Sequence, residues 1–437
     1  MTAEPDTSAT KTGNYFVANY PPFSTWRVED AHLANERLAR PPAAGTPLGL
    51  YVHIPFCRKR CDFCYFRVYT DKNSSAIARY LDAVIEEARM QAEHAAIAGR
   101  KPDFVYFGGG TPSYLSVKQL RYLFEGIQRH IPWDGAREIT FECEPGTLQE
   151  PKVNALKDMG VTRLSIGVEN FDADILERNN RAHRAKEIDR AYGFARAAGF
   201  RQVNIDLIAG MMGETDDNWR RCIERTVELA PDSVTIYQME IPFNTTVARR
   251  MKDGEQKVAP VADWATKRRW VGEAFAALER DGYYIGSAYT AARGENATFL
   301  YRDGLWHGAD MLCLGVASFG HIGGVHYQNV HDFDPYIERV ESGAAPIHRA
   351  LQLSDDQRLI REFILQLKLG RVDTRAFTEK FGVDPLERFA GPLQKHADDG
   401  FLSIDGARVE LARHGLLQVD RLLHDFFPDE HRKVRYA

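Results

Sequence analysis

Several features that would place the chain in a special class are missing from its sequence. No apolar run approaches the roughly 20 residues that a membrane helix needs. The opening segment, MTAEPDTSATKTGN, lacks the basic start and apolar core of a secretory signal. The formal net charge is -5 over 437 residues, so no broad basic surface is available for nucleic acid or an anionic membrane. We therefore expect a cytoplasmic protein without a membrane span, whose partner is a small molecule and not nucleic acid.

Cysteine is also scarce, and its distribution is uneven. The chain has six cysteines, of which three stand singly, unlike the paired framework of a secreted disulfide scaffold: Cys143, Cys222 and Cys313. We expect these three to be buried thiols. The other three fall within eight positions, in the segment HIPFCRKRCDFCYF: Cys57, Cys61 and Cys64.

Short apolar runs alternate with helical patterns through the middle of the chain. Six of these runs are predicted strands: LGLYVHIPF, DFVYFGGG, EITFECEP, RLSIGVE, VNIDLIAG and SVTIYQME. Repetition of strand, helix and strand requires right-handed crossovers and parallel strands. The body is therefore a doubly wound sheet or a complete or partial (β/α) barrel, and periodicity leaves that choice open.

The two ends of the chain follow other patterns. Residues 1–47 are predicted to form an irregular leader, and residues 48–345 form the body. Residues 346–437 are predicted to form a small helical and winged domain, because SDDQ at Ser354–Gln357 has the spacing of a helix capping box and GFLSIDGARVEL predicts a hairpin turning at Asp405 and Gly406. Acidic residues outnumber basic ones from Asp384 onward, which disfavours DNA binding by this domain.

The spacing C-x3-C-x2-C, directly after a strand, restricts the kind of site that the three clustered cysteines form. Structural zinc takes four protein ligands, so His53 or a distant residue would have to supply the fourth. A redox pair needs only two thiols and leaves Cys57 without a role. A four-iron cluster held by three thiolates keeps one iron open for an exogenous ligand, which explains why three cysteines are present. We favour the cluster over zinc, a redox pair or three unrelated core thiols.

This loop resembles the signature of the radical S-adenosylmethionine (SAM) superfamily. The segments YVHIPFC, FGGGTPSYL, ECEPGTL, RLSIGVENFD and NIDLIAGMMGET resemble, in order, the oxygen-independent coproporphyrinogen III oxidase family, and REFILQLKLG with ARHGLLQVD resembles that family's C-terminal domain. The resemblance implies a partial (β/α)6 TIM-like barrel with a 4Fe-4S cluster, followed by a small helical and winged domain. It also implies reductive cleavage of SAM to a 5′-deoxyadenosyl radical, with the electron supplied by a donor such as flavodoxin or ferredoxin.

The resemblance also implies the residues that hold the cofactors. Cys57, Cys61 and Cys64 would ligate the cluster, and the glycine run would lie against the methionine part of SAM. The cofactor-binding residues carried over from the family are Gly108, Gly109, Gly110, Thr111, Glu142, Arg181 and Asp206. Arg181 suits the cofactor carboxylate because a guanidinium fork matches carboxylate geometry. Asp206 stands in an apolar strand, where an unpaired charge would be costly.

Departures from the family pattern bear on the reaction. Phe66 replaces a further cysteine of the oxidases, and Glu169 stands where glutamine is usual. The haem chaperone branch often has a histidine-asparagine pair where this chain has Glu295-Asn296, although His307, His321 and His326 follow. By elimination, the leading prediction is the third branch, class C radical methyl or methylene transfer, with one or two SAM molecules and a conjugated or porphyrin-like substrate. The alternatives are oxidative decarboxylation of the coproporphyrinogen type and a non-catalytic haem-binding chaperone.

Candidate residues on the substrate side are those at or near predicted strand ends. Tyr51, Glu169 and Gln238 are the predicted catalytic residues, with Glu240 and Tyr289 as further candidates.

Overall fold

The computed structural model describes residues 15–241, 245–247, 261–294 and 297–432. These residues form two compact units, each assembled from segments that are distant in the sequence. Unit 1 comprises the described parts of Met1–Thr25, Leu207–Gly294 and Ser354–Ala437, and unit 2 comprises those of Trp26–Asp206 and Glu295–Leu353. The division of the chain at 47 and 345 stays a prediction.

Unit 2 contains the first strands of the predicted barrel. They are β1 (Leu48–Ile54), β2 (Phe104–Gly109), β3 (Glu138–Cys143), β4 (Arg163–Glu169) and the first part of β5 (Gln202–Ala209). β1 pairs in parallel with β2, β2 with β3, and β3 with β4. Their residues are largely buried, which is the pattern of a parallel sheet covered on both faces. Because parallel strands end on the same side, polar residues at their carboxyl ends lie close together.

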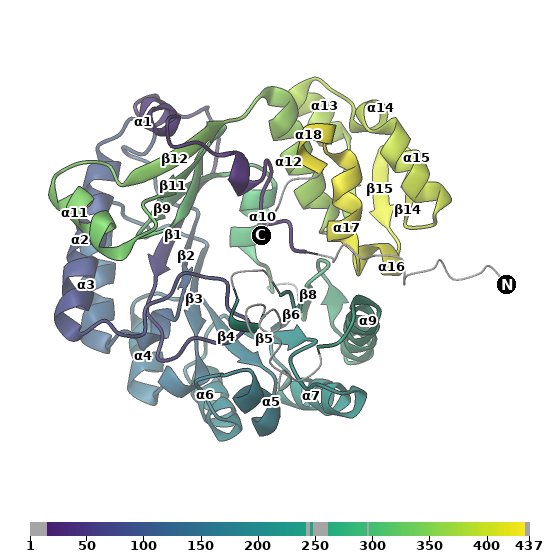
Figure 1. Cartoon of the computed structure of the whole chain (residues 1–437), viewed down its shortest axis with the longest axis horizontal. Coiled ribbons are helices and arrows are strands. Elements are labelled where there is room, and N and C mark those ends of the chain that lie inside the picture. The colour runs from purple at the N-terminus through teal and green to yellow at the C-terminus, as the bar shows by residue number, and fades with distance from the viewer. Residues whose placement is uncertain (1–14, 242–244, 248–260, 295–296, 433–437) are drawn as a thin grey trace. The chain divides into compact units, whose positions relative to one another are not determined.

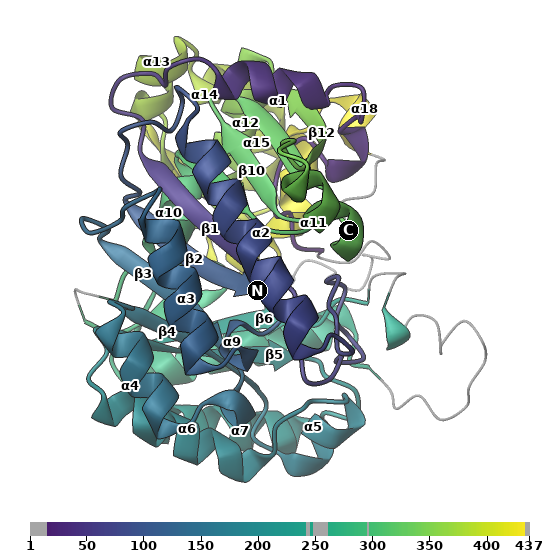
Figure 2. The ribbon, with the colours of Figure 1, turned by 90° about the vertical axis from the view of Figure 1, so that its left-hand side faces the viewer.

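Helices connect these strands and cover their outer side (Figures 1 and 2). Those in unit 2 are α2 (Ser74–Ala92), α3 (Val117–Gln128), α4 (Glu150–Asp158), α5 (Ala173–Arg178) and α6 (Ala185–Ala197), with 3-10 turns η3 (Pro112–Tyr114) and η4 (Pro145–Thr147). α2 is capped by Asn73, whose side chain accepts from the Ala76 amide. It buries the predicted apolar face, including Ile77, Tyr80 and Val84.

The rest of unit 2 lies beside β1. It consists of α10 (Leu300–Trp306), β9 (Asp310–Leu314), β10 (Phe319–Ile322), β11 (Val325–Asn329), α11 (Phe333–Glu341) and β12 (Ile347–Gln352). β9 is parallel to β1, and β10, β11 and β12 continue from it in antiparallel order. These strands extend the sheet on the β1 side.

The prediction of an irregular leader is wrong for part of residues 1–47. Helix α1 (Ala31–Leu38) forms there and packs against β11 and β12. Its Ala34 and Leu38 are four residues apart and both buried, so one helical face is held by packing. Residues 1–14 lie outside the described residues.

Unit 1 contains the end of β5, the last predicted strand and the C-terminal region. Its elements before the C-terminal region are η2 (Phe23–Thr25), α7 (Asp216–Leu229), β6 (Ser233–Gln238), α9 (Trp264–Arg280), β7 (Tyr284–Ile285) and β8 (Thr290–Ala292). All six strands predicted from the apolar runs are therefore present as β1 to β6. The succession of these strands and their helices is that of a partial (β/α)6 barrel, as predicted.

The C-terminal region is helical with a small sheet, as predicted. It contains α12 (Asp355–Leu367), β13 (Arg371–Asp373), α13 (Arg375–Phe381), α14 (Pro385–Arg388), α15 (Ala390–Asp398), β14 (Leu402–Asp405), β15 (Arg408–Leu411), α16 (Arg413–Leu416), α17 (Val419–Leu423), η5 (His424–Phe426) and α18 (Asp429–Arg432). The capping box of Ser354 and Gln357 is formed in both directions. The predicted hairpin is β14 paired with β15.

The described residues agree with two further expectations. Within them, no helix is both long and apolar enough to cross a membrane. Cys143, Cys222 and Cys313 are buried free thiols.

Candidate functional site

A loop after β1 carries the three clustered cysteines, and its backbone is held at both ends. The Cys57 amide donates to the Tyr69 carbonyl (3.1 Å), and the Tyr69 amide donates to the Pro55 carbonyl (2.8 Å). Between them, the Cys64 amide donates to the Cys61 carbonyl (3.1 Å). Residues 55–69, the cluster loop, are therefore a closed loop whose backbone presents three thiols from a short stretch of chain.

The three thiols fit a 4Fe-4S cluster in their chemistry and surroundings. All three are partly buried and free. Burial, together with the nearby Cys61, raises the pKa of Cys57 to about 11 and that of Cys64 to about 12. In the described part of the chain no three His, Cys, Asp or Glu side chains converge on a single metal ion. That arrangement is compatible with a cluster, because each thiolate binds a different iron.

Two hydrogen-bond donors from other segments reach the sulfurs. The Thr111 hydroxyl donates to Cys57 Sγ (3.3 Å), and the Arg181 guanidinium donates to Cys61 Sγ (3.2 Å). Donors of this kind stabilise thiolate, which is the form that binds iron. The predicted contacts of Thr111 and Arg181 with SAM stay predictions, whereas their contacts with the cysteines are part of the structure.

The glycine run at the end of β2 allows the cluster loop to approach closely. Gly109 has φ +114°, and a Cβ there would lie 2.5 Å from the His53 ring. A Cβ on Gly110 would lie 2.9 Å from the Phe56 carbonyl oxygen. The Thr111 amide donates to that same carbonyl (2.8 Å). A side chain on Gly110 would separate β2 from the cluster loop, and one on Gly109 would displace the His53 ring on β1.

Glu142 is fixed at the end of β3 by two donors. Its carboxylate accepts from the Tyr106 hydroxyl (2.5 Å) and from the Gly109 amide (3.2 Å). Burial raises the pKa of Glu142 to about 7, and the charges of Asp206 and Glu169 add to the increase. A Cβ on Gly108 would lie 3.1 Å from this carboxylate. The glycine run and Glu142 therefore form one surface.

Arg181 and Glu169 meet beside the cluster loop. Arg181 donates to the Gly167 carbonyl (2.7 Å) and lies 3.3 Å from the Glu169 carboxylate. Burial alone lowers the pKa of Arg181, but the negative Cys61 and Glu169 raise it overall. Burial raises the pKa of Glu169 to about 7, although Arg181 lowers it. Glu169 has φ +64°, a strained value for a residue with a side chain and typical of functional positions.

Asp206, in β5, completes a group of three carboxylates with Glu142 and Glu169. It accepts from the Ser165 hydroxyl (2.8 Å) and from the Asn204 side-chain amide (2.9 Å). Its charge raises the pKa of both glutamates. Partly buried carboxylates that repel one another favour a cationic ligand, and SAM carries a sulfonium and an ammonium group.

Tyr51, on β1, contacts His53 and the aromatic side of the site. Its hydroxyl lies 3.0 Å from His53 Nδ1, and its ring stacks on Tyr106 at a centroid distance of 6.0 Å. His53 is buried, burial lowers its pKa to about 4, and its Nε2 has no hydrogen-bond partner. A neutral imidazole with one free nitrogen therefore faces the region where Gly109 lacks a side chain.

Gln238 and the two further substrate candidates belong to unit 1. Gln238 donates to the Leu417 carbonyl (2.9 Å). Glu240 accepts from the Phe16 amide, and Tyr289 donates to Asp420. These contacts hold the segment after residue 14 and the C-terminal helices within unit 1. The cysteines belong to unit 2, and the substrate role of these residues stays a prediction.

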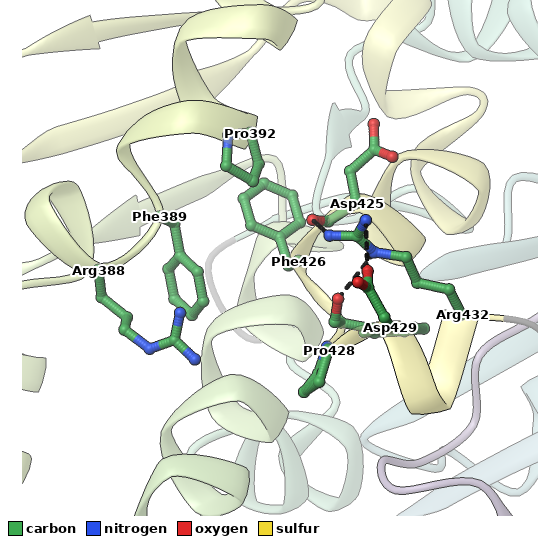
Figure 3. Close-up of a pocket in the computed structure, with 9 residues that line it drawn as sticks. Arg388, Phe389, Pro392, Asp425, Phe426, Pro428, Asp429 and Arg432 are labelled. Carbon is green, nitrogen blue, oxygen red and sulfur yellow. Dashed lines mark hydrogen bonds and ion pairs between the residues drawn. The ribbon is translucent and has the colours of Figure 1, made fainter.

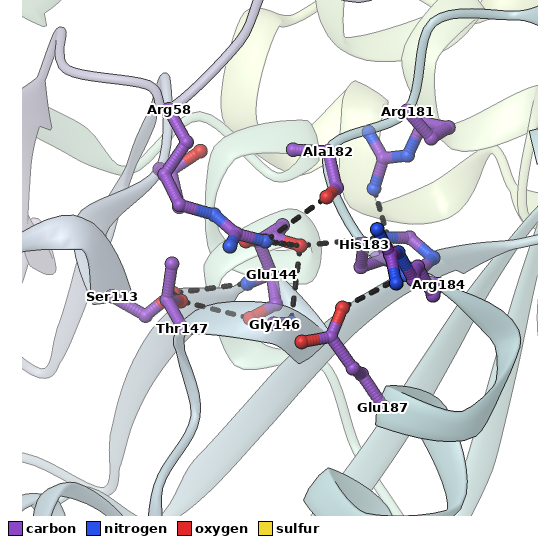
Figure 4. Close-up of polar contacts among 12 residues, drawn as sticks. Arg58, Ser113, Glu144, Gly146, Thr147, Arg181, Ala182, His183, Arg184 and Glu187 are labelled. Atoms are coloured by element: carbon purple, nitrogen blue, oxygen red, sulfur yellow. Dashed lines mark hydrogen bonds and ion pairs between the residues drawn. The ribbon is translucent and has the colours of Figure 1, made fainter. Parts of the chain in front are cut away.

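Sequence reasoning missed an ion pair that is attached to the cluster loop (Figure 4). Arg58 binds the Glu144 carboxylate through two nitrogens, and His183 lies 3.4 Å from the same carboxylate. Burial alone raises the pKa of Glu144, but His183 and Arg58 bring it down to about 2. The only signal in the sequence was an acidic residue directly after a strand, with no indication of its partner.

A pocket of about 320 Å³ lies in the C-terminal region of unit 1 (Figure 3). Its charged lining is already paired, because Arg388 binds Asp356 and Arg432 binds Asp429. None of the predicted site residues lines it.

Comparison with known proteins gives two family matches. The radical SAM superfamily matches residues 51–226, and the HemN C-terminal domain matches residues 353–417. A similar curated protein is the oxygen-independent coproporphyrinogen III oxidase of Pseudomonas aeruginosa, 28% identical over 86% of this chain and 84% of that protein. Heme chaperone HemW of Mycobacterium tuberculosis is 29% identical over 87% of this chain and 95% of its own length.

A solved structure agrees with these matches. Coproporphyrinogen III oxidase (HemN) from Escherichia coli, a radical SAM enzyme, superposes with a TM-score of 0.82 at 26% identity, covering 94% of this chain and 96% of that one. The radical SAM superfamily binds a 4Fe-4S cluster and SAM, and the residues around Cys57, Cys61 and Cys64 fit both. The chain therefore carries a radical SAM domain and a HemN C-terminal domain, and it is similar over most of its length to coproporphyrinogen III oxidase.

Proposed function

We propose that the protein is a radical SAM enzyme that removes propionate carboxyl groups from a coproporphyrinogen-like tetrapyrrole by oxidation. The observation that carries this proposal is the structural likeness to coproporphyrinogen III oxidase over 94% of this chain. The likeness extends beyond the radical SAM segment and the C-terminal domain, which cover residues 51–226 and 353–417. Methyl transfer, the leading prediction from sequence, gains no support from the relatives compared here, which are named as oxidases and haem chaperones.

The cofactor side of the reaction rests on this chain's own residues. Cys57, Cys61 and Cys64 would hold the cluster, which when bound supplies the electron that cleaves SAM. Arg181 holds Cys61 and Glu169 in place. Glu142, whose pKa is raised to about 7, would shift toward its ionised form beside a bound sulfonium and ammonium group, and Asp206 lies close enough to affect its charge.

Glu169, which stands where the oxidase family usually has glutamine, is compatible with the oxidase reaction. With a pKa raised to about 7, its carboxyl is substantially protonated near neutral pH. A protonated carboxyl offers one O–H donor and one carbonyl acceptor, which resembles the amide of the glutamine usual in the family. Glu169 therefore serves the same hydrogen-bonding role in its neutral form.

The substrate reaction balances with one external acceptor. One hydrogen atom is abstracted from the propionate carbon next to the ring, the C–C bond to the carboxylate breaks, carbon dioxide leaves and a vinyl group forms. One electron is left over for each propionate, and it passes to a one-electron acceptor. We propose that a flavodoxin or a ferredoxin supplies the electron for SAM cleavage.

A haem carrier is the second candidate, because heme chaperone HemW matches 87% of this chain. The Glu295-Asn296 pair, where that branch often has a histidine, lies outside the described residues. Among the nearby histidines, His321 and His326 are in contact through their Nδ1 atoms (2.9 Å), and His307 Nδ1 contacts the Asp303 carbonyl oxygen (2.7 Å). A hydrogen bond at one ring nitrogen is compatible with metal binding through the other, so these contacts do not separate the carrier from the enzyme.

The test is anaerobic. The reconstituted protein is given SAM, a strong reductant and coproporphyrinogen III, and 5′-deoxyadenosine, S-adenosylhomocysteine and vinyl products are measured together by mass spectrometry. The proposal predicts 5′-deoxyadenosine and vinyl products without S-adenosylhomocysteine. The Cys57→Ser variant should form neither 5′-deoxyadenosine nor vinyl products. Stoichiometric haem binding without 5′-deoxyadenosine formation would contradict the proposal and favour a haem carrier. Substrate-dependent formation of S-adenosylhomocysteine would favour methyl transfer.

A further inference from the structure

One guanidinium connects the cluster loop to Glu144, directly after β3, and to the segment that contains Arg181, a donor to Cys61. Arg58, directly after Cys57, donates from Nε to Glu144 Oε2 (3.2 Å) and from Nη2 to Glu144 Oε1 (2.9 Å). The same Nη2 donates to the Ala182 carbonyl (3.2 Å), next to Arg181. Figure 4 shows these contacts converging on the Glu144 carboxylate.

Glu144 is itself held in place before Arg58 binds it. Its carboxylate accepts from the Gly146 amide (3.1 Å) as the cap of η4, and its own amide donates to the Ser113 hydroxyl (2.9 Å). The side chain is 9% exposed, against 36% for Arg58. A buried carboxylate with fixed neighbours provides a rigid acceptor for the two guanidinium bonds.

The contacts close a ring of interactions around the first cluster cysteine. Thr111 donates to Cys57, Ser113 lies two residues further along and accepts from Glu144, and Glu144 binds Arg58, the neighbour of Cys57. Every segment in this ring except the cluster loop is a strand end or a 3-10 turn. The loop is therefore tied to the rigid part of unit 2.

We propose that Arg58 and Glu144 position the cluster loop before iron binds and so favour capture of the cluster. Arg58 is a positioning residue in this role and touches no iron. The inference rests on cluster binding by the three cysteines and is independent of the substrate.

An ion pair elsewhere in unit 2 provides a matched control. Arg79 on α2 binds Glu341 on α11 through two nitrogens at 2.7 and 2.6 Å, but both side chains are about half exposed. Exposed pairs contribute little to stability, and this one joins two helices away from the cluster loop. Arg79→Gln removes an arginine-glutamate ion pair of the same kind but changes no contact of residues 55–69.

Gly146 provides a variant that keeps every charge. A Cβ at this position would lie 2.1 Å from Arg58 Nη2 and 3.0 Å from Glu144 Oε1. Its backbone does not have a positive φ, so alanine fits the turn. Gly146→Ala therefore displaces the guanidinium fork with little other change.

The experiment measures amide exchange in the cluster-free protein and iron uptake at limiting iron. The amides to follow are those of Asp62, bonded to Asn179, and Cys64, bonded to Cys61. Exchange should be about tenfold faster in Arg58→Gln and Gly146→Ala, the factor for one charge-assisted hydrogen bond. Both variants should also capture less iron, whereas Arg79→Gln should match the wild type in both measurements.

Wild-type exchange rates in both Arg58→Gln and Gly146→Ala would overturn the proposal, as would faster exchange with normal iron uptake. If Arg58→Gln fails to fold, Gly146→Ala decides alone. Failure of the proposed tetrapyrrole reaction gives a different result. The variants would still exchange faster than the wild type and the wild type would still load iron, but no vinyl products would form.

Discussion

The shifted pKa of Glu142 predicts how the stability of the cluster-free protein changes with pH. Its pKa moves from 4.5 to about 7, mainly through burial. Between these values the folded protein keeps a proton that the unfolded chain has released. The folded state is therefore stabilised fully at low pH and loses this contribution as the pH rises toward 7. A shift of about 2.5 units at 1.36 kcal/mol each corresponds to roughly 3 kcal/mol.

The perturbation is Glu142→Gln, which cannot ionise. Urea unfolding of the cluster-free wild type and variant at pH 5 and pH 8 gives two free energies of unfolding for each. We expect the loss between these pH values to be smaller in the variant by about 2.5 kcal/mol, because the unfolded chain has already released much of this proton at pH 5. Any hydrogen bond that glutamine fails to make is lost at both pH values, so it cancels in the difference.

A second variant should change the pH dependence in the opposite direction. The Tyr106 hydroxyl donates to the Glu142 carboxylate (2.5 Å) and so lowers the pKa of Glu142. Tyr106→Phe removes this donor and should raise that pKa. Its stability should fall more steeply with pH than that of the wild type. Equal pH dependence in wild type, Glu142→Gln and Tyr106→Phe would refute the reasoning about Glu142.

Three further predictions concern separate parts of the chain. Changing Cys57, Cys61 and Cys64 together to Ser should abolish iron binding measured after reconstitution, whereas changing the buried thiols Cys143, Cys222 and Cys313 to Ala should leave it intact; iron retained by the first variant would contradict the site. Gly109→Ala should lower the free energy of unfolding in urea by about 1–3 kcal/mol and weaken SAM binding, because Gly109 has φ +114° and His53 occupies the space of a Cβ. Gly135 has open space around it, so the control Gly135→Ala should behave as wild type. Lys368→Met should cost about 3–5 kcal/mol by removing the cationic partner of the Asp420 carboxylate, because both side chains are at most 1% exposed and their charged atoms lie 2.9 Å apart. The more exposed pair of Lys395 and Asp425 is the control, and equal melting temperatures for Lys368→Met and Lys395→Met would count against the prediction.

Local patterns predicted the elements of the barrel well. β1 to β6 are continuous apolar runs between turns, and the box at Ser354 and Gln357 has a fixed spacing of three residues. The three cysteines were identified because their spacing is itself the signal. These features depend on neighbours in the sequence, so one sequence suffices to find them.

Features that join distant segments were not predictable in this way. The Arg58 and Glu144 pair links residues 86 positions apart, and no periodicity marks it. Gln238 stands at a strand end, which favours a site position, but its amide is used by Leu417, 179 residues away. Helix α1 was missed because its buried face consists of only Ala34 and Leu38, too few for a periodic pattern.

The most direct test of the account is whether SAM binds at one open iron of a cluster held by Cys57, Cys61 and Cys64. The protein is reconstituted anaerobically with isotopically enriched iron, and Mössbauer spectra are recorded with and without SAM. The account predicts about four irons per chain and a change on SAM addition in about one quarter of the signal. Spectra that SAM leaves unchanged, in protein with a complete cluster, would contradict it.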